Sequence, residues 1–133
     1  MPKTPKRGGV SRPRAHAPRK RFGQNFLSDQ SVISAIAKAI NPHKDDNVVE
    51  IGPGQGALTN ALFESDCAIK VIEIDRDLQS QLRVMFFNRD FTLFDFDALK
   101  FDFNELSDCD HDLRIVGNLP YNIATPLIFK LLT

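Results

Sequence analysis

Beyond residue 21, apolar positions alternate between short continuous runs and helical repeats. The runs predict four buried strands, at residues 47–51, 68–74, 91–94 and 113–116. The repeats predict four helices, at residues 32–40, around 58–62, around 78–85 and at 126–133. Ser28 or Asp29 would cap the first helix, and Asn41-Pro42 would end it. Thr125 would cap the last helix, and Pro126 would open it.

Strands that alternate with helices are typical of βαβ units, so the fold class is α/β with a parallel sheet. In such sheets, ligands bind beyond the carboxyl ends of the strands. Two groups of candidate functional residues, at 52–56 together with 73 and at 118–121, lie at the carboxyl ends of predicted strands. The phenylalanines, including Phe86, Phe87, Phe101 and Phe103, are expected to fill the core rather than stack on bases.

Length and charge divide the chain into two parts. The 133 residues suit one domain, with 42% apolar and 26% charged residues. Residues 1–21 hold eight basic residues, no acidic residue and four prolines, so we expect a flexible basic extension. Residues 22–133 hold nine basic and 17 acidic residues, a net charge of −8. A nucleic-acid partner would therefore be attracted mainly by the basic end.

The sequence also argues against several classes of protein. It has no apolar run of 18 residues and no apolar segment near the N-terminus, so neither a membrane span nor secretion is expected. Cys67 and Cys109 form no Cys-x-x-Cys motif, which favours a reducing cytoplasm over a disulfide scaffold or a zinc site. The acidic stretch 108–112 is expected to be a solvated loop, so no metal site is predicted.

A glycine loop follows the first predicted strand. Gly52, Gly54 and Gly56 would allow a sharp turn and close approach to a ligand, and Glu73 ends the next strand, where a carboxylate can accept both ribose hydroxyls. A ligand-free strand-to-helix turn would use the same glycines. The spacing also satisfies the dinucleotide fingerprint, so an NAD-dependent enzyme competes with other nucleoside ligands. Pro53 opposes NAD because it has no N–H for a pyrophosphate.

A second candidate site, Asn118-Leu119-Pro120-Tyr121, follows the fourth strand. The Asn118 side-chain oxygen and the Leu119 carbonyl could accept the two hydrogens of a nucleobase amine. Such an arrangement would orient the amine toward an electrophile. Tyr121 could stack on an extruded base. A simple strand-to-loop turn with a core tyrosine is the alternative for this tetrapeptide taken alone.

Five segments in order resemble one known family, the rRNA adenine dimethyltransferases, and most closely their bacterial small-subunit (16S) branch. They are RKRFGQNFL at 19–27, VEIGPGQG at 49–56, IEID at 72–75, DAL at 97–99 and GNLPYNIATP at 117–126. The resemblance implies a Rossmann-like, class I S-adenosylmethionine-dependent methyltransferase. Its implied product is N6,N6-dimethyladenosine on two adjacent adenines near the 3′ end of 16S rRNA, made during small-subunit ribosome biogenesis in the cytoplasm.

The resemblance also implies residue roles. Gln24, Asn25 and Leu27 would close over S-adenosylmethionine, Gly52 and Gly54 would line it, and Glu73 would bind its ribose. Asp97, with Ala98 beside it, would meet the cofactor adenine, and Asp95 is the alternative. Asn118 would hold the target amine close to the cofactor, and Leu119, Pro120 and Tyr121 would complete the acceptor site. Immature small subunits would be the partner, and the full-length protein would be a monomer without a metal.

The length departs from the family, which continues with further strands and a small helical domain. We therefore expect residues 22–133 to form the N-terminal part of the catalytic domain, truncated after the fourth strand and inactive alone. Two other functions remain open. One is a drug-resistance methyltransferase of 23S rRNA, although Leu119, Thr125-Pro126 and the segment before Gln24 favour the small-subunit type. The other is a non-catalytic RNA-binding or assembly factor, which intact Asn118 and Tyr121 disfavour.

Overall fold

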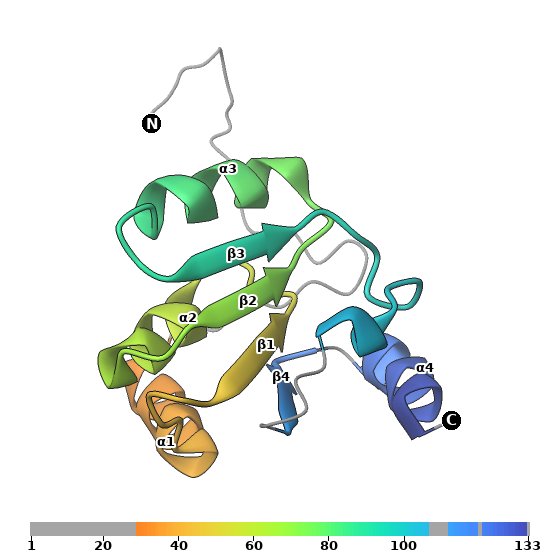
Figure 1. Ribbon diagram of the computed structural model, residues 1–133, viewed down its shortest axis with the longest axis horizontal. Helices are drawn as coiled ribbons and strands as arrows, with labels where there is room; N and C mark the ends of the chain where they lie inside the picture. The colour runs from red at the N-terminus through yellow and green to blue at the C-terminus, as the bar shows by residue number, and fades with distance from the viewer. Residues whose placement is uncertain (1–28, 107–111, 120, 133) are drawn as a thin grey trace.

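Four parallel strands form one sheet in the order β3-β2-β1-β4 (Figure 1). The computed structural model describes residues 29–106, 112–119 and 121–132. The strands are β1 (Asn47–Ile51), β2 (Ile69–Ile72), β3 (Phe91–Phe94) and β4 (Leu113–Gly117). The helices are α1 (Gln30–Ile40), α2 (Ala57–Leu62), α3 (Arg76–Met85) and α4 (Tyr121–Leu132), with 3₁₀ turns η2 (Phe63–Ser65) and η3 (Phe103–Leu106). The predicted parallel α/β sheet is confirmed. The basic extension at 1–21 lies outside the described residues.

Local capping residues set the ends of two helices. The Asp29 side chain accepts hydrogen bonds from the Ser31 and Val32 amides, so Asp29 caps α1. Asn41 ends this helix, as predicted, and adopts the left-handed conformation that asparagine tolerates at a helix C-terminus. Asp75 caps α3 in the same way as Asp29 caps α1. The second strand is shorter than predicted, because the chain leaves the ladder after Ile72.

The predicted start of the last helix is wrong. Helix α4 begins at Tyr121, and Pro126 lies inside it rather than at its first position. A proline in a helix interior removes the N–H that would bond to the carbonyl four residues earlier, at a cost of about 3 kcal/mol. Packing offsets this cost, since Leu127 is 3% exposed and belongs to the core beneath the helix. Tertiary contacts thus override the local signal for a helix start at Pro126.

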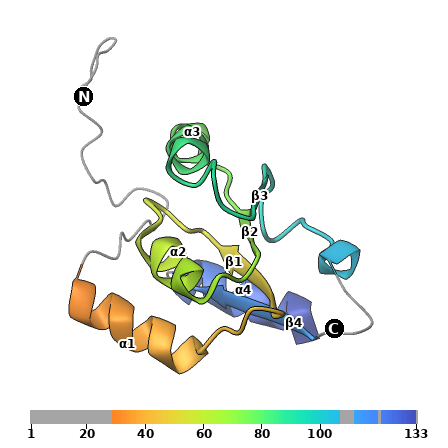
Figure 2. The same ribbon diagram turned by 60° about the vertical axis from the view of Figure 1, so that its left-hand side comes forward.

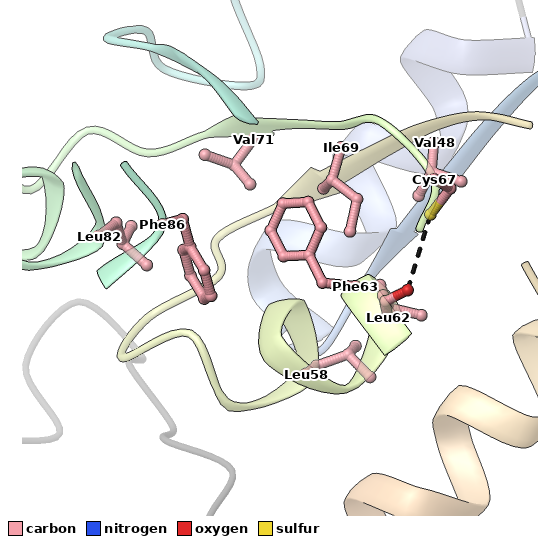
Figure 3. Packing of buried hydrophobic residues seen from close by; sticks show 9 residues of the cluster. All are labelled: Val48, Leu58, Leu62, Phe63, Cys67, Ile69, Val71, Leu82 and Phe86. Atoms are coloured by element: carbon pink, nitrogen blue, oxygen red, sulfur yellow. Dashed lines mark hydrogen bonds between the residues drawn. The ribbon is translucent and has the colours of Figure 1, made fainter. Parts of the chain in front are cut away.

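Each face of the sheet carries its own apolar core. Helices α1, α2 and α3 lie on one face of the sheet (Figure 2). Their side chains and those of η2 pack around Phe63, and Figure 3 shows the buried residues of this cluster. Phe63 and Phe86 lie with ring centroids 5.1 Å apart, and the Cys67 thiol donates to the Leu62 carbonyl. Side chains from η3 and α4 pack on the other face, around Val49, Ile51 and Ile72.

Most of the phenylalanines that were expected in the core are there, but Phe87 is not. Phe86, Phe101 and Phe103 are buried, whereas Phe87 is 83% exposed. Helix α3 ends at Met85, so Phe86 and Phe87 occupy adjacent positions of the turn that follows. Neighbouring side chains point in different directions, and only Phe86 faces the sheet.

Arg114 of β4 joins that edge strand to α1. Its guanidinium donates to the Ile40 carbonyl at the end of α1 and to the Asp46 carboxylate at 2.7 Å. The last carbonyls of a helix have no partner within it, so Arg114 satisfies one of them from the sheet. The backbone N–H of His43, and secondarily Arg114, hold the pKa of Asp46 below its usual value.

The exposed flank formed by β4 and α4 predicts self-association of the 133-residue chain. In the described sheet β4 pairs with β1 alone, and Ile128, Phe129 and Leu132 of α4 are 55%, 68% and 79% exposed. The free backbone N–H and C=O groups of an edge strand, with exposed apolar side chains beside them, can pair with another chain. We expect sedimentation velocity to show dimers or larger species, and the Phe129→Glu change to shift them toward monomer. A concentration-independent monomer of the unaltered chain would contradict this prediction.

Candidate functional site

The residues that directly follow the four strands form one row at the carboxyl edge of the sheet. Ile51 pairs with Ile72 and with Gly117, and Ile72 pairs with Phe94. The next residues along the chain are Asp95, Glu73, Gly52 and Asn118, in the order of the strands. The strand register therefore brings together the glycine loop, the predicted ribose carboxylate and the predicted amine-binding asparagine.

The glycine loop turns through three residues in the left-handed region, with φ of 64° at Gly52, 59° at Gly54 and 87° at Gly56. A Cβ added at Gly52 or at Gly56 would come close to other side chains of the protein. A Cβ at Gly52 would lie 3.1 Å from Leu119 Cδ2. A Cβ at Gly56 would lie 3.0 Å from Leu82 Cδ2 and 3.1 Å from Phe86 Cε2.

These contacts refine the prediction that the glycines make room for a ligand. Gly56 is buried and lets the loop pack directly on α3, whereas Gly52 is exposed and lies against the leucine of the Asn-Leu-Pro-Tyr segment. The two predicted motifs are therefore in contact through Gly52 and Leu119. The missing side chains at Gly52 and Gly56 serve packing within the protein as well as any ligand.

Glu73 is held in place by the backbone around it. Its Oε2 accepts hydrogen bonds from the Ile74 and Asp75 amides, each at 3.0 Å, and the Gly54 N–H also bonds to the carboxylate. The residue is 7% exposed. Burial raises its pKa above the usual value, although the backbone hydrogen bonds oppose this effect. The carboxylate thus has a fixed orientation beside the glycine loop.

Two aspartates follow β3, and their carboxylates accept hydrogen bonds from different groups. Asp95 is exposed, stands level with Glu73 in the row, and accepts a hydrogen bond from Gln79 Nε2 at 2.8 Å. Asp97 is half-buried, and its Oδ1 accepts from the Leu99 amide at 3.0 Å. Ala98 is buried in the core beneath. Both carboxylates lie past the end of β3, as the sequence predicts.

The predicted acceptor segment, residues 118–121, begins directly after β4. Asn118 is exposed, and Leu119 is half-buried against Gly52 and the core. Tyr121 is the first residue of α4, so it lies on a helix rather than in the loop, and its side chain lies outside the described part. The predicted site residues Gln24, Asn25, Leu27 and Pro120 lie outside the described residues as well.

The sequence reasoning missed a buried carboxyl group behind the glycine loop. Glu50 of β1 is 2% exposed, and its Oε1 accepts a hydrogen bond from the Thr59 hydroxyl of α2. Burial raises the pKa of Glu50 to about 7; the Thr59 hydrogen bond lowers it, and the nearby Glu73 charge raises it. A charged residue inside the apolar run 48–51 was the available signal, since such residues are seldom buried without a partner.

Two exposed apolar side chains also stand at this edge. Ile74 is 61% exposed directly after Glu73, and Phe96 is 52% exposed between Asp95 and Asp97. Their exposure beside carboxylates suits a ligand that has both a flat apolar part and hydroxyl or amino groups. A nucleoside has both.

Within residues 29–106, 112–119 and 121–132, no three metal-ligating side chains gather at one place. In the same part of the chain, no helix is long and apolar enough to cross a membrane. Most of the acidic stretch 108–112 lies outside the described residues.

Comparison with known proteins identifies the family. The model of a family described as ribosomal RNA adenine dimethylase matches residues 15–133. The chain belongs to this family. The resemblance inferred from five sequence segments is thereby confirmed.

Named relatives are similar over most of this chain but are much longer. Ribosomal RNA small subunit methyltransferase A of Hahella chejuensis is 56% identical over 119 residues, which cover 89% of this chain and 44% of the relative. The protein of the same name from Chromohalobacter salexigens is 53% identical and is matched over 50% of its length. The chain thus spans half or less of the length of these curated relatives.

Solved structures of similar proteins share the fold. The 23S rRNA methyltransferase ErmE is 28% identical with a TM-score of 0.67, over 79% of this chain and 41% of that one. A dimethyladenosine transferase from Plasmodium falciparum is 28% identical with a TM-score of 0.65, over 81% of this chain and 38% of that one. The predicted Rossmann-like methyltransferase fold is therefore confirmed.

Proposed function

We propose that the protein carrying this chain transfers methyl groups from S-adenosylmethionine to N6 of two adjacent adenines near the 3′ end of 16S rRNA. The observation that carries the proposal is the row at the sheet edge, where Glu73, Gly52 and Asn118 lie side by side in a member of the rRNA adenine dimethylase family. The partner would be the immature small ribosomal subunit in the cytoplasm. Relatives at 53–56% identity are named for the small subunit, which favours this target.

The residues of the edge fit S-adenosylmethionine. Glu73 would accept the ribose hydroxyls, because its carboxylate is already oriented by the Ile74 and Asp75 amides. The exposed glycine loop at Gly52 and Gly54 would lie along the amino-acid part, and no phosphate has to be held at Pro53. Asp97 would meet the adenine amine with Ala98 beside it, and Gln24, Asn25 and Leu27 would cover the cofactor. When bound, S-adenosylmethionine supplies a methyl group on a positively charged sulfur.

Asn118 would orient the acceptor. Its side-chain oxygen and the Leu119 carbonyl would accept the two hydrogens of the adenine amine, which aims the nitrogen lone pair at the methyl group. Pro120 and Tyr121 would complete this site, with Tyr121 stacking on the base. No strong base is needed, since the nitrogen becomes acidic once it is alkylated. Contact between Gly52 and Leu119 would keep the two halves of the site in register.

The basic segment 1–21 would supply the attraction to RNA, because the rest of the chain carries a net charge of −8.

A 23S rRNA target is the second candidate, favoured by the likeness to ErmE. Methyl transfer to immature 30S subunits and to 23S rRNA would separate the two. That assay needs a longer protein, such as this chain joined to the second half of the Hahella chejuensis relative, and we expect the 133-residue chain alone to be inactive.

The Glu73→Ala change tests the cofactor assignment. Removing the carboxylate leaves two ribose hydroxyls unpaired, so we expect S-adenosylhomocysteine to bind more weakly by about 1–3 kcal/mol, or roughly 5- to 150-fold in Kd. Isothermal titration calorimetry on the 133-residue chain measures this change. Glu64→Ala, which removes an exposed carboxylate of η2, is the matched control. Tight binding of NAD with no response to S-adenosylhomocysteine would refute the assignment.

A further inference from the structure

Gln79 of α3 joins the turn after β2 to the turn after β3. Its side chain is largely buried, at 8% exposed, although glutamine is usually found at the surface. Its Nε2 donates two hydrogen bonds of 2.8 Å, one to the Glu73 carbonyl and one to Asp95 Oδ1. Both hydrogens of the amide are therefore used, and they join two chain segments that follow different strands.

These bonds lie where the strand ladder ends. The Glu73 amide donates to the Phe94 carbonyl at 3.1 Å, at the last step of the β2–β3 pairing. Beyond this step the chain turns into α3 on one side and into residues 95–97 on the other. The Gln79 amide bridges the two segments where the backbone ladder has stopped.

Backbone and side chain of the same residue close the turn that carries Glu73. The Gln79 backbone N–H bonds to the Asp75 carbonyl at 2.9 Å, and the Glu73 carboxylate accepts from the Ile74 and Asp75 amides. Residues 73–79 thus form a closed set of hydrogen bonds with the Glu73 carboxylate at one end. Loss of the Gln79 amide would free both the Glu73 carbonyl and Asp95.

We propose that Gln79 is a positioning residue for the adenosine part of the cofactor, because it holds the Glu73 turn and the 95–97 segment at a set separation. This inference rests on the proposed function, in which Glu73 binds the ribose and the 95–97 segment meets the adenine. Gln79 does not touch the ligand. It acts by fixing the two segments between which the nucleoside is held.

The test compares variants of one helix in the 133-residue chain. Gln79→Leu keeps the size of the side chain but removes both donors, whereas Gln79→Lys keeps a donor group that can reach an oxygen on each segment. Gln81→Leu is the matched control, because Gln81 is an exposed glutamine of the same helix. S-adenosylhomocysteine and free adenosine are titrated well below the midpoint of thermal unfolding of each variant.

We expect Gln79→Leu to weaken both ligands by about tenfold, since two hydrogen bonds that order the site are lost. Gln79→Lys should restore most of this loss, and Gln81→Leu should bind both ligands as the unaltered chain does. A purely structural role would lower the unfolding midpoint without changing either Kd in the folded protein, and that result would overturn the inference. Failure of this chain joined to the second half of a longer relative to bind S-adenosylhomocysteine would instead refute the proposed function.

Discussion

Asn118→Ala is expected to lower methyl transfer to rRNA by about 100-fold or more, which corresponds to about 3 kcal/mol of transition-state stabilisation. Asn118 is exposed beside Gly52 at the sheet edge, so the change removes an acceptor for the adenine amine without opening a cavity in the core. The loss should fall on kcat, because orientation of the amine matters most when the new bond forms. Radiolabelled methyl transfer to immature 30S subunits, by this chain joined to the second half of a longer relative, measures it.

Cofactor binding supplies the control for this prediction. The Kd for S-adenosylhomocysteine should change much less than kcat, since the proposed role of Asn118 is mainly toward the acceptor. Asn122→Ala, at an exposed position on the first turn of α4, is a matched variant that should retain activity. Normal turnover by Asn118→Ala would show that the amine is held elsewhere.

Glu50→Gln is expected to stabilise the chain at pH 8 and to have little effect near pH 4.5. The native state holds a proton on Glu50 up to about pH 7, whereas the unfolded chain releases it near 4.5. The stabilisation that the protonated group provides is therefore complete below pH 4.5 and is lost as the pH rises to 7. Glutamine remains neutral at every pH, and its side-chain oxygen can still accept from Thr59.

The expected difference can be measured by urea unfolding. A rise in pKa from 4.5 to about 7 corresponds to about 3 kcal/mol, so the variant should gain up to that amount between pH 4.5 and pH 8. Glu64→Gln, which neutralises an exposed carboxylate of η2, should show no comparable gain. Equal stabilities of Glu50→Gln and the unaltered chain at pH 8 would show that Glu50 is charged without cost in the native state.

The sequence by itself determined the class of fold and the order of its elements. Continuous apolar runs that alternate with helical repeats can be buried only in a parallel sheet covered by helices, and all four strands form where the runs lie. Caps such as Asp29 are also local, because the side chain bonds to amides two and three residues away. The five motif segments were sufficient to indicate the family.

The tertiary structure decided what depends on contacts between distant residues. Pro126 reads locally as a helix start, yet packing of Leu127 against the sheet extends α4 back to Tyr121. Gly56 reads as room for a ligand, yet the space is filled by Leu82 of α3 and by Phe86 of the turn that follows it. The sequence gives no sign of the partners of Gln79 and Glu50, because Asp95 and Thr59 are 16 and 9 residues away. Such partners meet only when strand register and helix packing bring them together, and a local pattern carries no information about either.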